Sequence, residues 1–348
     1  VGWGNNYTPN EGRVSVYINN GTWQKLGTDI SGVNEDWVKN LSSQTNAAFK
    51  EKYLEIWGVE YSPSVASHSL STAWQNGVNG FGTDVSISND GNRIGVVQGN
   101  VYRDITAIVR TFEYTNGIWE QLGEDILGGG RNSGADDFAG IISVDISGDG
   151  MTLAVGARYS CGDGINETRG GNNIGAVKIF SWDDATNNWI QKGDRQLGFS
   201  DAFVGGGNAM TNAYLWSQVW WFGYTVSLNN DGTRIAIGAP TSSDMGCVFI
   251  RDWDPSEEKW IDVWQTDFLN KGSQHQDGYT IFLTQDGQHL ITGAQRQNGA
   301  AERQGFAYIY RINSYNESEA STLVTAPTRG VIQKRSTLQR VTAAAGAV

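Results

Sequence analysis

The 348-residue chain is poor in the residues from which catalytic and metal sites are usually built. It has only two cysteines and three histidines, and 18% of its residues are charged, fewer than the ~25% of an average globular domain. Its net charge of −12 argues against nucleic acid as a partner, because binding to phosphates relies on an excess of Lys and Arg. No segment approaches the ~18 apolar residues of a membrane-spanning helix. We therefore expect a soluble globular protein without a membrane span.

Glycine and aromatic residues are abundant instead, with 45 glycines and 14 tryptophans. Four segments share one pattern: an alternating apolar run, an Asp-Gly pair, and a second apolar run that ends in Gly and a small residue. They span residues 81–97, 138–157, 222–240 and 277–294, with Asp-Gly at 90/91, 149/150, 231/232 and 286/287. Asp-Gly between two such runs predicts a β-hairpin closed by a type I′ turn, in which both central residues have positive φ.

A second hairpin pattern follows the first three of these segments and also opens the chain. It consists of an aromatic-alternating strand, a polar turn and a strand that begins with tryptophan. Its copies span residues 13–30, 109–126, 176–194 and 247–264, and its first half recurs at 306–312. The equivalent tryptophans are Trp23, Trp119, Trp189 and Trp260. Because each indole can bury ~150–250 Å², we predict that they are core residues.

Two hairpins per unit make four strands, which is the unit of a β-propeller blade. The segments FGTDVSISNDG and FGYTVSLNNDGTRIAIGAP resemble the FG-GAP-type repeats of integrin α-chain β-propellers. They are also similar to secreted microbial and algal repeat proteins with W-x-Q-L-G-x-D-I units. The resemblance covers residues 1–312 and implies an all-β propeller of about five four-stranded blades, the first and last incomplete. It implies nothing about chemistry, because function on such folds lies in sites added to them.

The incomplete end blades leave closure of the ring open. The ring closes if residues 320–342 supply strands, or if another chain does. Alternatively, the blades form an open arc that upstream sequence or a neighbour completes.

Two insertions, residues 31–80 and 199–222, interrupt the repeat. Helical spacing of aromatic residues over 34–57, after a candidate N-cap at Asn34, predicts a small helical insertion. Five tryptophans of the two insertions are candidates for an interface or a glycan surface. They are Trp37, Trp57, Trp216, Trp220 and Trp221.

The segment 313–348 is predicted to be an extended basic tail that docks on the chain itself or on a neighbour. Residues 320–348 contain four basic residues and no acid. These four are further interface candidates, namely Arg329, Lys334, Arg335 and Arg340. Docking of this tail on the acidic body of a second copy would give head-to-tail assembly.

No catalytic residue, metal site or cofactor is predicted. The three histidines, His68, His275 and His289, have no Ser or Cys motif beside them. Paired acids fall in turns, and each Asp-Gly turn offers a single carboxylate where a calcium loop needs several.

Five glycosylation sequons favour secretion or a cell-surface location, with acceptors at Asn6, Asn20, Asn40, Asn166 and Asn316. Cys161 and Cys247 either form one disulfide or are two separate thiols. The sequence thus favours a non-enzymatic extracellular protein that acts as a structural or adhesive subunit through contacts with copies of itself or other surface proteins. The alternatives are a lectin-like propeller that binds carbohydrate through exposed tryptophans, and a hydrolase with an unrecognised carboxylate pair.

Overall fold

The computed structural model describes twelve parts of the chain, all of them strands, turns or short connections. They are residues 12–31, 81–98, 107–128, 138, 140–160, 175–197, 221–240, 246–265, 277–294, 306–312, 333–335 and 338–341. The described residues contain no helix, and the helical insertion expected over 34–57 lies outside them. None of the described residues forms a helix long and apolar enough to cross a membrane.

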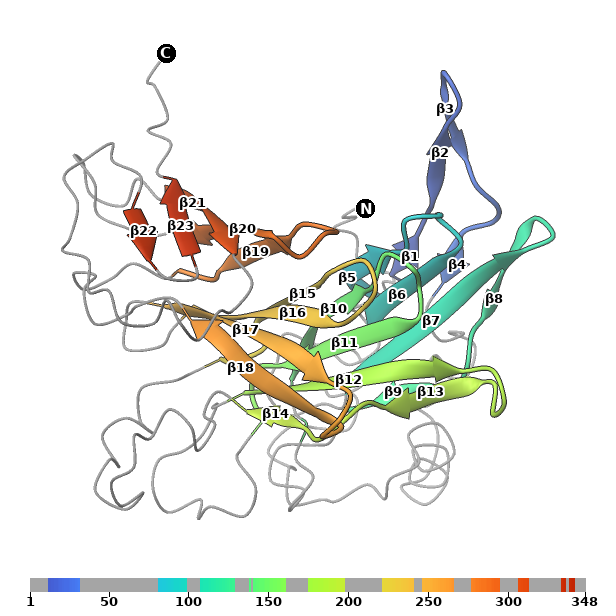
Figure 1. Ribbon diagram of the computed structural model, residues 1–348. Helices are drawn as coiled ribbons and strands as arrows, with labels where there is room; N and C mark the ends of the chain where they lie inside the picture. The colour runs from blue at the N-terminus through green and yellow to red at the C-terminus, as the bar shows by residue number, and fades with distance from the viewer. Residues whose placement is uncertain are drawn as a thin grey trace, which may run out of the picture.

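The strands form five successive antiparallel blades (Figure 1). Blade 1 consists of β1 (Arg13–Val14), β2 (Tyr17–Asn19), β3 (Trp23–Lys25) and β4 (Ile30–Ser31). Blade 2 consists of β5 (Phe81–Ile87), β6 (Arg93–Gln98), β7 (Ile108–Thr115), β8 (Ile118–Gln121) and β9 (Ile126–Leu127). Blade 3 consists of β10 (Ile141–Ile146), β11 (Thr152–Ala157), β12 (Ala176–Asp183), β13 (Asn188–Gln191) and β14 (Gln196–Leu197).

Blades 4 and 5 continue the series. Blade 4 consists of β15 (Thr225–Leu228), β16 (Arg234–Ala239), β17 (Cys247–Asp254) and β18 (Lys259–Gln265). Blade 5 consists of β19 (Thr280–Leu283), β20 (His289–Ala294), β21 (Phe306–Ile312), β22 (Gln333–Arg335) and β23 (Leu338–Val341).

The blades are arranged as in a β-propeller, with the first strand of each blade innermost. The innermost strands β5, β10, β15 and β19 lie side by side in this order, and the other strands of each blade follow outward. Among the described residues, blade 1 contains the pairs β1–β4 and β2–β3 and no inner hairpin like β5–β6, so it is incomplete, as expected. In blade 5, β23 pairs with β21, the place that β8, β13 and β18 take in blades 2 to 4.

The Asp-Gly hairpins form as predicted, but the prediction that type I′ turns close them is wrong. Only the glycine has positive φ, 75° at Gly91, and the amide of Gly91 donates to the carbonyl of Ser88 at 3.0 Å. This is a type I turn followed by a left-handed residue. The carboxylate of Asp90 stabilises the turn by accepting from the amide of Asn92 at 3.0 Å and from the hydroxyl of Ser88 at 2.6 Å.

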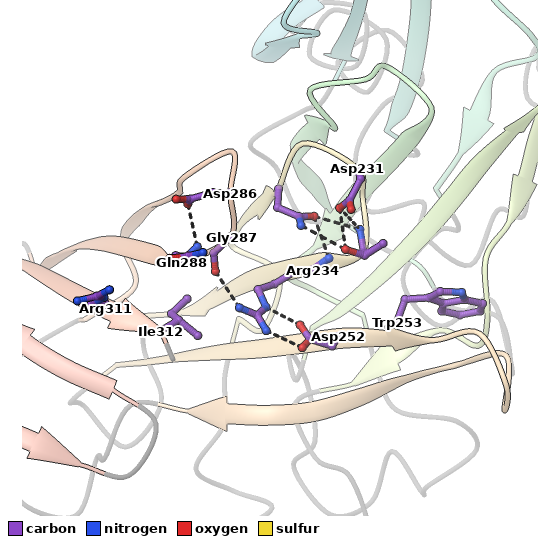
Figure 2. Close-up of a pocket in the computed structure, with 11 residues that line it drawn as sticks. Asp231, Arg234, Asp252, Trp253, Asp286, Gly287, Gln288, Arg311 and Ile312 are labelled. Carbon is purple, nitrogen blue, oxygen red and sulfur yellow. Dashed lines mark hydrogen bonds and ion pairs between the residues drawn. The ribbon is translucent and has the colours of Figure 1, made fainter. Parts of the chain in front are cut away.

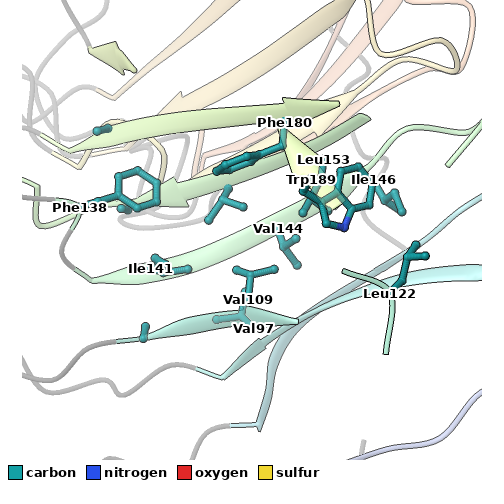
Figure 3. Packing of buried hydrophobic residues seen from close by; sticks show 14 of the residues in the cluster. Val97, Val109, Leu122, Phe138, Ile141, Val144, Ile146, Leu153, Phe180 and Trp189 are labelled. Carbon is teal, nitrogen blue, oxygen red and sulfur yellow. The ribbon is translucent and has the colours of Figure 1, made fainter. Parts of the chain in front are cut away.

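The hydrophobic core lies between the blades. One cluster joins Val97 and Val109 of blade 2 to Val144, Leu153 and other residues of blade 3 (Figure 3). Equivalent clusters fill the spaces between blades 1 and 2, 3 and 4, and 4 and 5. Since no blade encloses a core by itself, the stability of each blade depends on its neighbours.

A tryptophan and a glycine form a repeated contact between the outer strands of successive blades. Trp260 lies 7% exposed against Gly193 of the preceding blade, and its Nε1 donates to the carbonyl of Lys192 at 3.0 Å. A Cβ built on Gly193 would come within 2.9 Å of Trp253 and 3.3 Å of Trp260. The same contact joins Trp119 to Gly27 and Trp189 to Gly123. We call these contacts the Trp–Gly contacts.

Trp23 does not follow the prediction that all four equivalent tryptophans belong to the core. Trp189 is 6% exposed, whereas Trp23 is 72% exposed. It stands on the β2–β3 hairpin, which projects away from the other strands (Figure 1). The physical reason is positional, because the described residues contain no blade before blade 1 that could supply the glycine.

We predict that Gly193→Ala destabilises the protein more than Gly91→Ala. The two glycines have almost equal φ, 74° and 75°, so both variants bear the same cost of a left-handed alanine, ~1–2 kcal/mol. Only Gly193 faces a tryptophan, and nothing lies within 4 Å of a Cβ at Gly91. The clash should add ~1–3 kcal/mol to the loss in free energy of unfolding, measured by urea denaturation. Equal losses for the two variants would show that the Trp–Gly contacts tolerate a methyl group.

Candidate functional site

The innermost strands expose a row of backbone amides, and side chains of the preceding blade accept from them. In blades 2 to 4 the residue four positions before the Asp of the turn contacts the innermost strand of the next blade. The hydroxyl of Ser86 accepts from the amide of Ile146 at 3.0 Å, and that of Ser227 accepts from the amide of Leu283 at 3.0 Å. Between them, Asp145 Oδ2 accepts from the amide of Leu228 at 2.7 Å. These axial bonds join blades 2 to 5 in succession.

Asp145 is one of two carboxylates that accept from amides of the next innermost strand, the other being Asp84, and it is largely buried. Besides the amide of Leu228, it accepts the hydroxyl of Ser86 on Oδ1 at 2.5 Å. Burial raises the pKa of Asp145 to about 6, and the negative charge of Asp84 adds to the effect. Burial also raises the pKa of Asp84, whose Oδ2 accepts from the amide of Val144 at 2.9 Å.

Asp84 and Asp145 were not among the residues that the sequence singled out, although burial raises the pKa of both. Both oxygens of Asp145 accept bonds from the protein itself, so it is committed to holding blades together. A comparison of equivalent repeat positions could have found it, because Ser86, Asp145 and Ser227 occupy one position and all three are polar on a strand that faces the axis.

One end of the axis is closed by the Asp-Gly turns. The side-chain amide of Asn89 donates to Asn230 Oδ1 at 2.8 Å and to Gln285 Oε1 at 3.1 Å. A Cβ at Gly148 would lie 2.3–2.4 Å from these three amide groups, so a larger residue there would displace them. The turns of blades 2 to 5 therefore meet at this end of the axis.

The other end of the axis carries a buried arginine among aromatic rings. Arg158 follows β11, and Tyr224 and Tyr279 precede β15 and β19, which places all three at the strand ends opposite the turns. The guanidinium carbon of Arg158 lies 4.5 Å from the ring centre of Tyr159, 5.3 Å from that of Trp221 and 5.7 Å from that of Tyr224. We call these five residues, Arg158, Tyr159, Trp221, Tyr224 and Tyr279, the Arg158 cluster.

The aromatic rings of the Arg158 cluster pack against one another as well as against the arginine. Trp221 stacks on Tyr224 with an interplanar angle of 13°, and Tyr224 contacts Tyr279 with ring centres 4.9 Å apart. Burial and a hydrogen bond to Tyr279 raise the pKa of Tyr224, so its phenol stays neutral. The φ of Trp221 is 65°, a left-handed conformation that is unusual for a bulky residue and is typical of functional sites.

The charge of Arg158 has no acidic partner among the described residues. The residue is 8% exposed, and its Nε is buried without a hydrogen-bond partner, as is Ser160 Oγ. A buried donor left unsatisfied costs ~1–3 kcal/mol, and each cation–π contact returns only ~0.5–2 kcal/mol. Among the described residues, Arg158 therefore keeps at least one donor, Nε, that no acceptor uses.

A cavity of about 660 Å³ lies between blades 4 and 5 at the turn end of the molecule (Figure 2). Its central side chain, Arg234, donates from Nε and Nη2 to Asp252 at 2.6 and 2.7 Å and from Nη1 to the carbonyl of Gly287 at 2.8 Å. Arg93 and Lys192 bond the equivalent glycine carbonyls of the next blades, Gly150 and Gly232. The cavity is thus one copy of a repeated contact between blades, and its central charge, Arg234, is paired with Asp252.

The structure describes only some of the residues proposed from the sequence. Trp221 belongs to the Arg158 cluster, Lys334 and Arg335 lie in β22, and Arg340 lies in β23. Asn20 is exposed in the β2–β3 turn, Cys247 is buried at the start of β17, and His289 begins β20. The remaining candidates lie outside the described residues: Trp37, Trp57, Trp216, Trp220, Arg329, Asn6, Asn40, Asn166, Asn316, Cys161, His68 and His275.

Comparisons with known proteins give weak likenesses to propeller structures. No family model matches the chain, and no curated protein matches it. TolB from Acinetobacter baumannii is 14% identical over 67% of this chain and 41% of its own, with a TM-score of 0.33. The tricorn protease is 10% identical over 66% of this chain and 18% of its own, with a TM-score of 0.33. A presumed 6-phosphogluconolactonase from Bacteroides fragilis is 16% identical over 52% of this chain and 37% of its own, with a TM-score of 0.30.

In each case the match spans less than half of the other protein's chain. At these identities and TM-scores, the likenesses carry no argument about what this protein does. The assignment of the blades above depends on the strand pairing of the structure itself.

We predict that Asp145→Asn removes a pH dependence of stability between pH 4 and 6. A carboxyl whose folded pKa is raised from 3.8 to about 6 stabilises the fold fully below pH 3.8, and this contribution is lost as the pH rises through 6. The difference in free energy of unfolding between wild type and Asp145→Asn should therefore change by about 2–3 kcal/mol across this window. Urea denaturation at several pH values measures it.

Asp286→Asn is the matched control, with the opposite sign. Hydrogen bonds from Thr284 and from the amide of Gln288 lower the pKa of Asp286, so its contribution is present above pH 3.8 and is lost as the pH falls below it. A difference between wild type and Asp145→Asn that stays constant from pH 4 to 7 would contradict the role assigned to Asp145.

Proposed function

We propose that the protein is a non-enzymatic, extracellular β-propeller that acts as a structural or adhesive subunit through protein–protein contacts. The observation that carries the proposal is the exposure of Trp23, 72%, at a position where equivalent tryptophans are 6% and 7% exposed. Tyr17 lies on the same face of the β2–β3 hairpin and is 56% exposed. Exposed apolar residues that share a face in this way are typical of partner-binding surfaces.

The partner is defined by the chemistry of the Trp–Gly contacts. A tryptophan of this series needs a glycine with positive φ on the preceding blade, and a carbonyl or hydroxyl acceptor beside it. The acceptors are the carbonyl of Leu26 at 2.9 Å for Trp119 and the hydroxyl of Thr111 at 2.7 Å for Trp189. Trp23 is therefore suited to bind the outer strands of another blade.

The described residues favour a different protein over a second copy of this chain. Its three glycines of this type, Gly27, Gly123 and Gly193, are each already covered by a tryptophan. Four residues after Trp260, the equivalent position holds Trp264 in place of glycine. We therefore propose a partner that carries W-x-x-L-G blades of its own.

The absence of catalysis is part of the same proposal. Within the described ranges, no group of three His, Cys, Asp or Glu side chains could hold a metal ion. The turn aspartates accept from their own turns, and Asp145 accepts from two blades. These carboxylates are engaged in holding the fold, which supports binding over hydrolysis.

We predict that Trp23→Ala abolishes assembly without loss of stability. Because Trp23 is mostly exposed, its removal should change the free energy of unfolding by less than ~0.5 kcal/mol. Trp189→Ala, at a buried equivalent position, should cost ~3–5 kcal/mol. Mass photometry of tagged full chain, purified from secreting cells that make the natural partners, should show complexes larger than 37.9 kDa for wild type only.

Low and high salt distinguish the nature of the contact. A contact centred on an indole should persist at high salt, whereas docking of the basic tail should weaken. A wild-type monomer at both salt concentrations, or complexes of Trp23→Ala equal to those of wild type, would overturn the proposal.

A further inference from the structure

The Arg158 cluster has the properties expected of an anion-binding site. Elsewhere in the described strands, the buried and half-buried arginines have carboxylate partners. The pairs are Arg93–Glu113 at 2.8 Å, Arg110–Asp125 at 2.9 Å, Arg234–Asp252 at 2.6 Å and Arg251–Asp262 at 2.5 Å. Arg158, which is 8% exposed, forms no ion pair or side-chain hydrogen bond with any described residue.

The position of the cluster fits a ligand site. It lies at the end of the axis opposite the Asp-Gly turns, where strands of blades 3, 4 and 5 meet. At the turn end the axis is occupied by Asn89, Asn230 and Gln285, which hydrogen-bond one another across it.

The chemistry of the cluster specifies what would bind. An arginine whose Nε is buried and unpartnered offers its remaining donors to a carboxylate or a sulfate, which accept from a guanidinium in a planar, two-bond arrangement. The rings of Tyr159, Trp221 and Tyr224 surround it, and aromatic faces beside a polar group are suited to the apolar face of a sugar ring. The hydroxyls of Tyr224 and Tyr279 add polar groups for sugar hydroxyls.

We propose that the Arg158 cluster binds an acidic saccharide, with the carboxylate of a uronic acid or a sulfate ester on Arg158 and the sugar ring against Trp221 or Tyr224. This site is separate from the Trp23 surface, so neither proposal depends on the other. The carbohydrate-binding alternative is thereby assigned to the Arg158 cluster, and its ligand is required to carry a negative charge.

Isothermal titration of the full chain tests the proposal with three probes, galacturonic acid, galactose 6-sulfate and galactose. We expect one or both of the acidic sugars to bind and galactose to bind at least tenfold more weakly. Arg158→Met should weaken binding of the acidic sugar by tenfold or more, and Arg158→Lys, which keeps the charge but loses the planar fork, by about three- to tenfold. Sodium chloride should weaken binding by wild type.

Arg13→Met is the matched control, because it removes one positive charge at an exposed position, 64% for the side chain. It should leave binding unchanged. Thermal melting without sugar gives an independent readout: Arg158→Met should melt at or above the wild-type temperature, because replacing an unpaired buried charge by an apolar side chain relieves its burial.

Several results would overturn the proposal. They are equal binding of galactose and the acidic sugars, unchanged binding by Arg158→Met, equal losses for Arg13→Met and Arg158→Met, and a lowered melting temperature of Arg158→Met. Binding of a polyglutamate peptide as tight as that of galacturonic acid would assign the site to acidic chains in general and would also overturn the choice of a saccharide.

Discussion

The whole structure depends on hydrogen bonds to the free amide edge of each innermost strand. A four-stranded blade leaves one edge unpaired at the axis, and buried backbone donors without partners are costly. In this protein, Ser86, Asp145 and Ser227 accept from the amides of the next blade. The donors are therefore satisfied by side chains of a neighbouring blade, so the relative position of the blades is set at the axis to within a hydrogen-bond length.

The outer part of the blades is held by different contacts. Away from the axis, indoles pack on glycines, and Arg93, Lys192 and Arg234 bond the carbonyls of the neighbouring turns. Polar contacts at the axis, apolar clusters between the sheets and cations at the turns thus act on the same pairs of blades. At the turn end, the side chains of the turns are engaged in these contacts between blades. The opposite end of the axis carries Arg158 and its aromatic neighbours.

The sequence predicts the repeated parts of this structure well and the unique parts poorly. Blade boundaries follow from alternation and Asp-Gly pairs, which are local signals. The turn type was wrong because the same dipeptide also fits a type I turn when only Gly91 takes positive φ. Trp23 has the same place in the repeat as Trp189, and its exposure depends on whether a blade precedes it. The Arg158 cluster draws residues from three blades, and no local pattern indicates such a meeting.

The Trp–Gly contacts have a direction, since each tryptophan faces the glycine of the blade before it. One repeat contributes one of each, so a duplicated repeat would bring a matching tryptophan and glycine for the contacts on both of its sides. Trp264, which stands where the next glycine would be, ends this series. A further repeat could form Trp–Gly contacts within the array or before the first blade. It could not form one after the fourth blade, where Trp264 replaces the glycine.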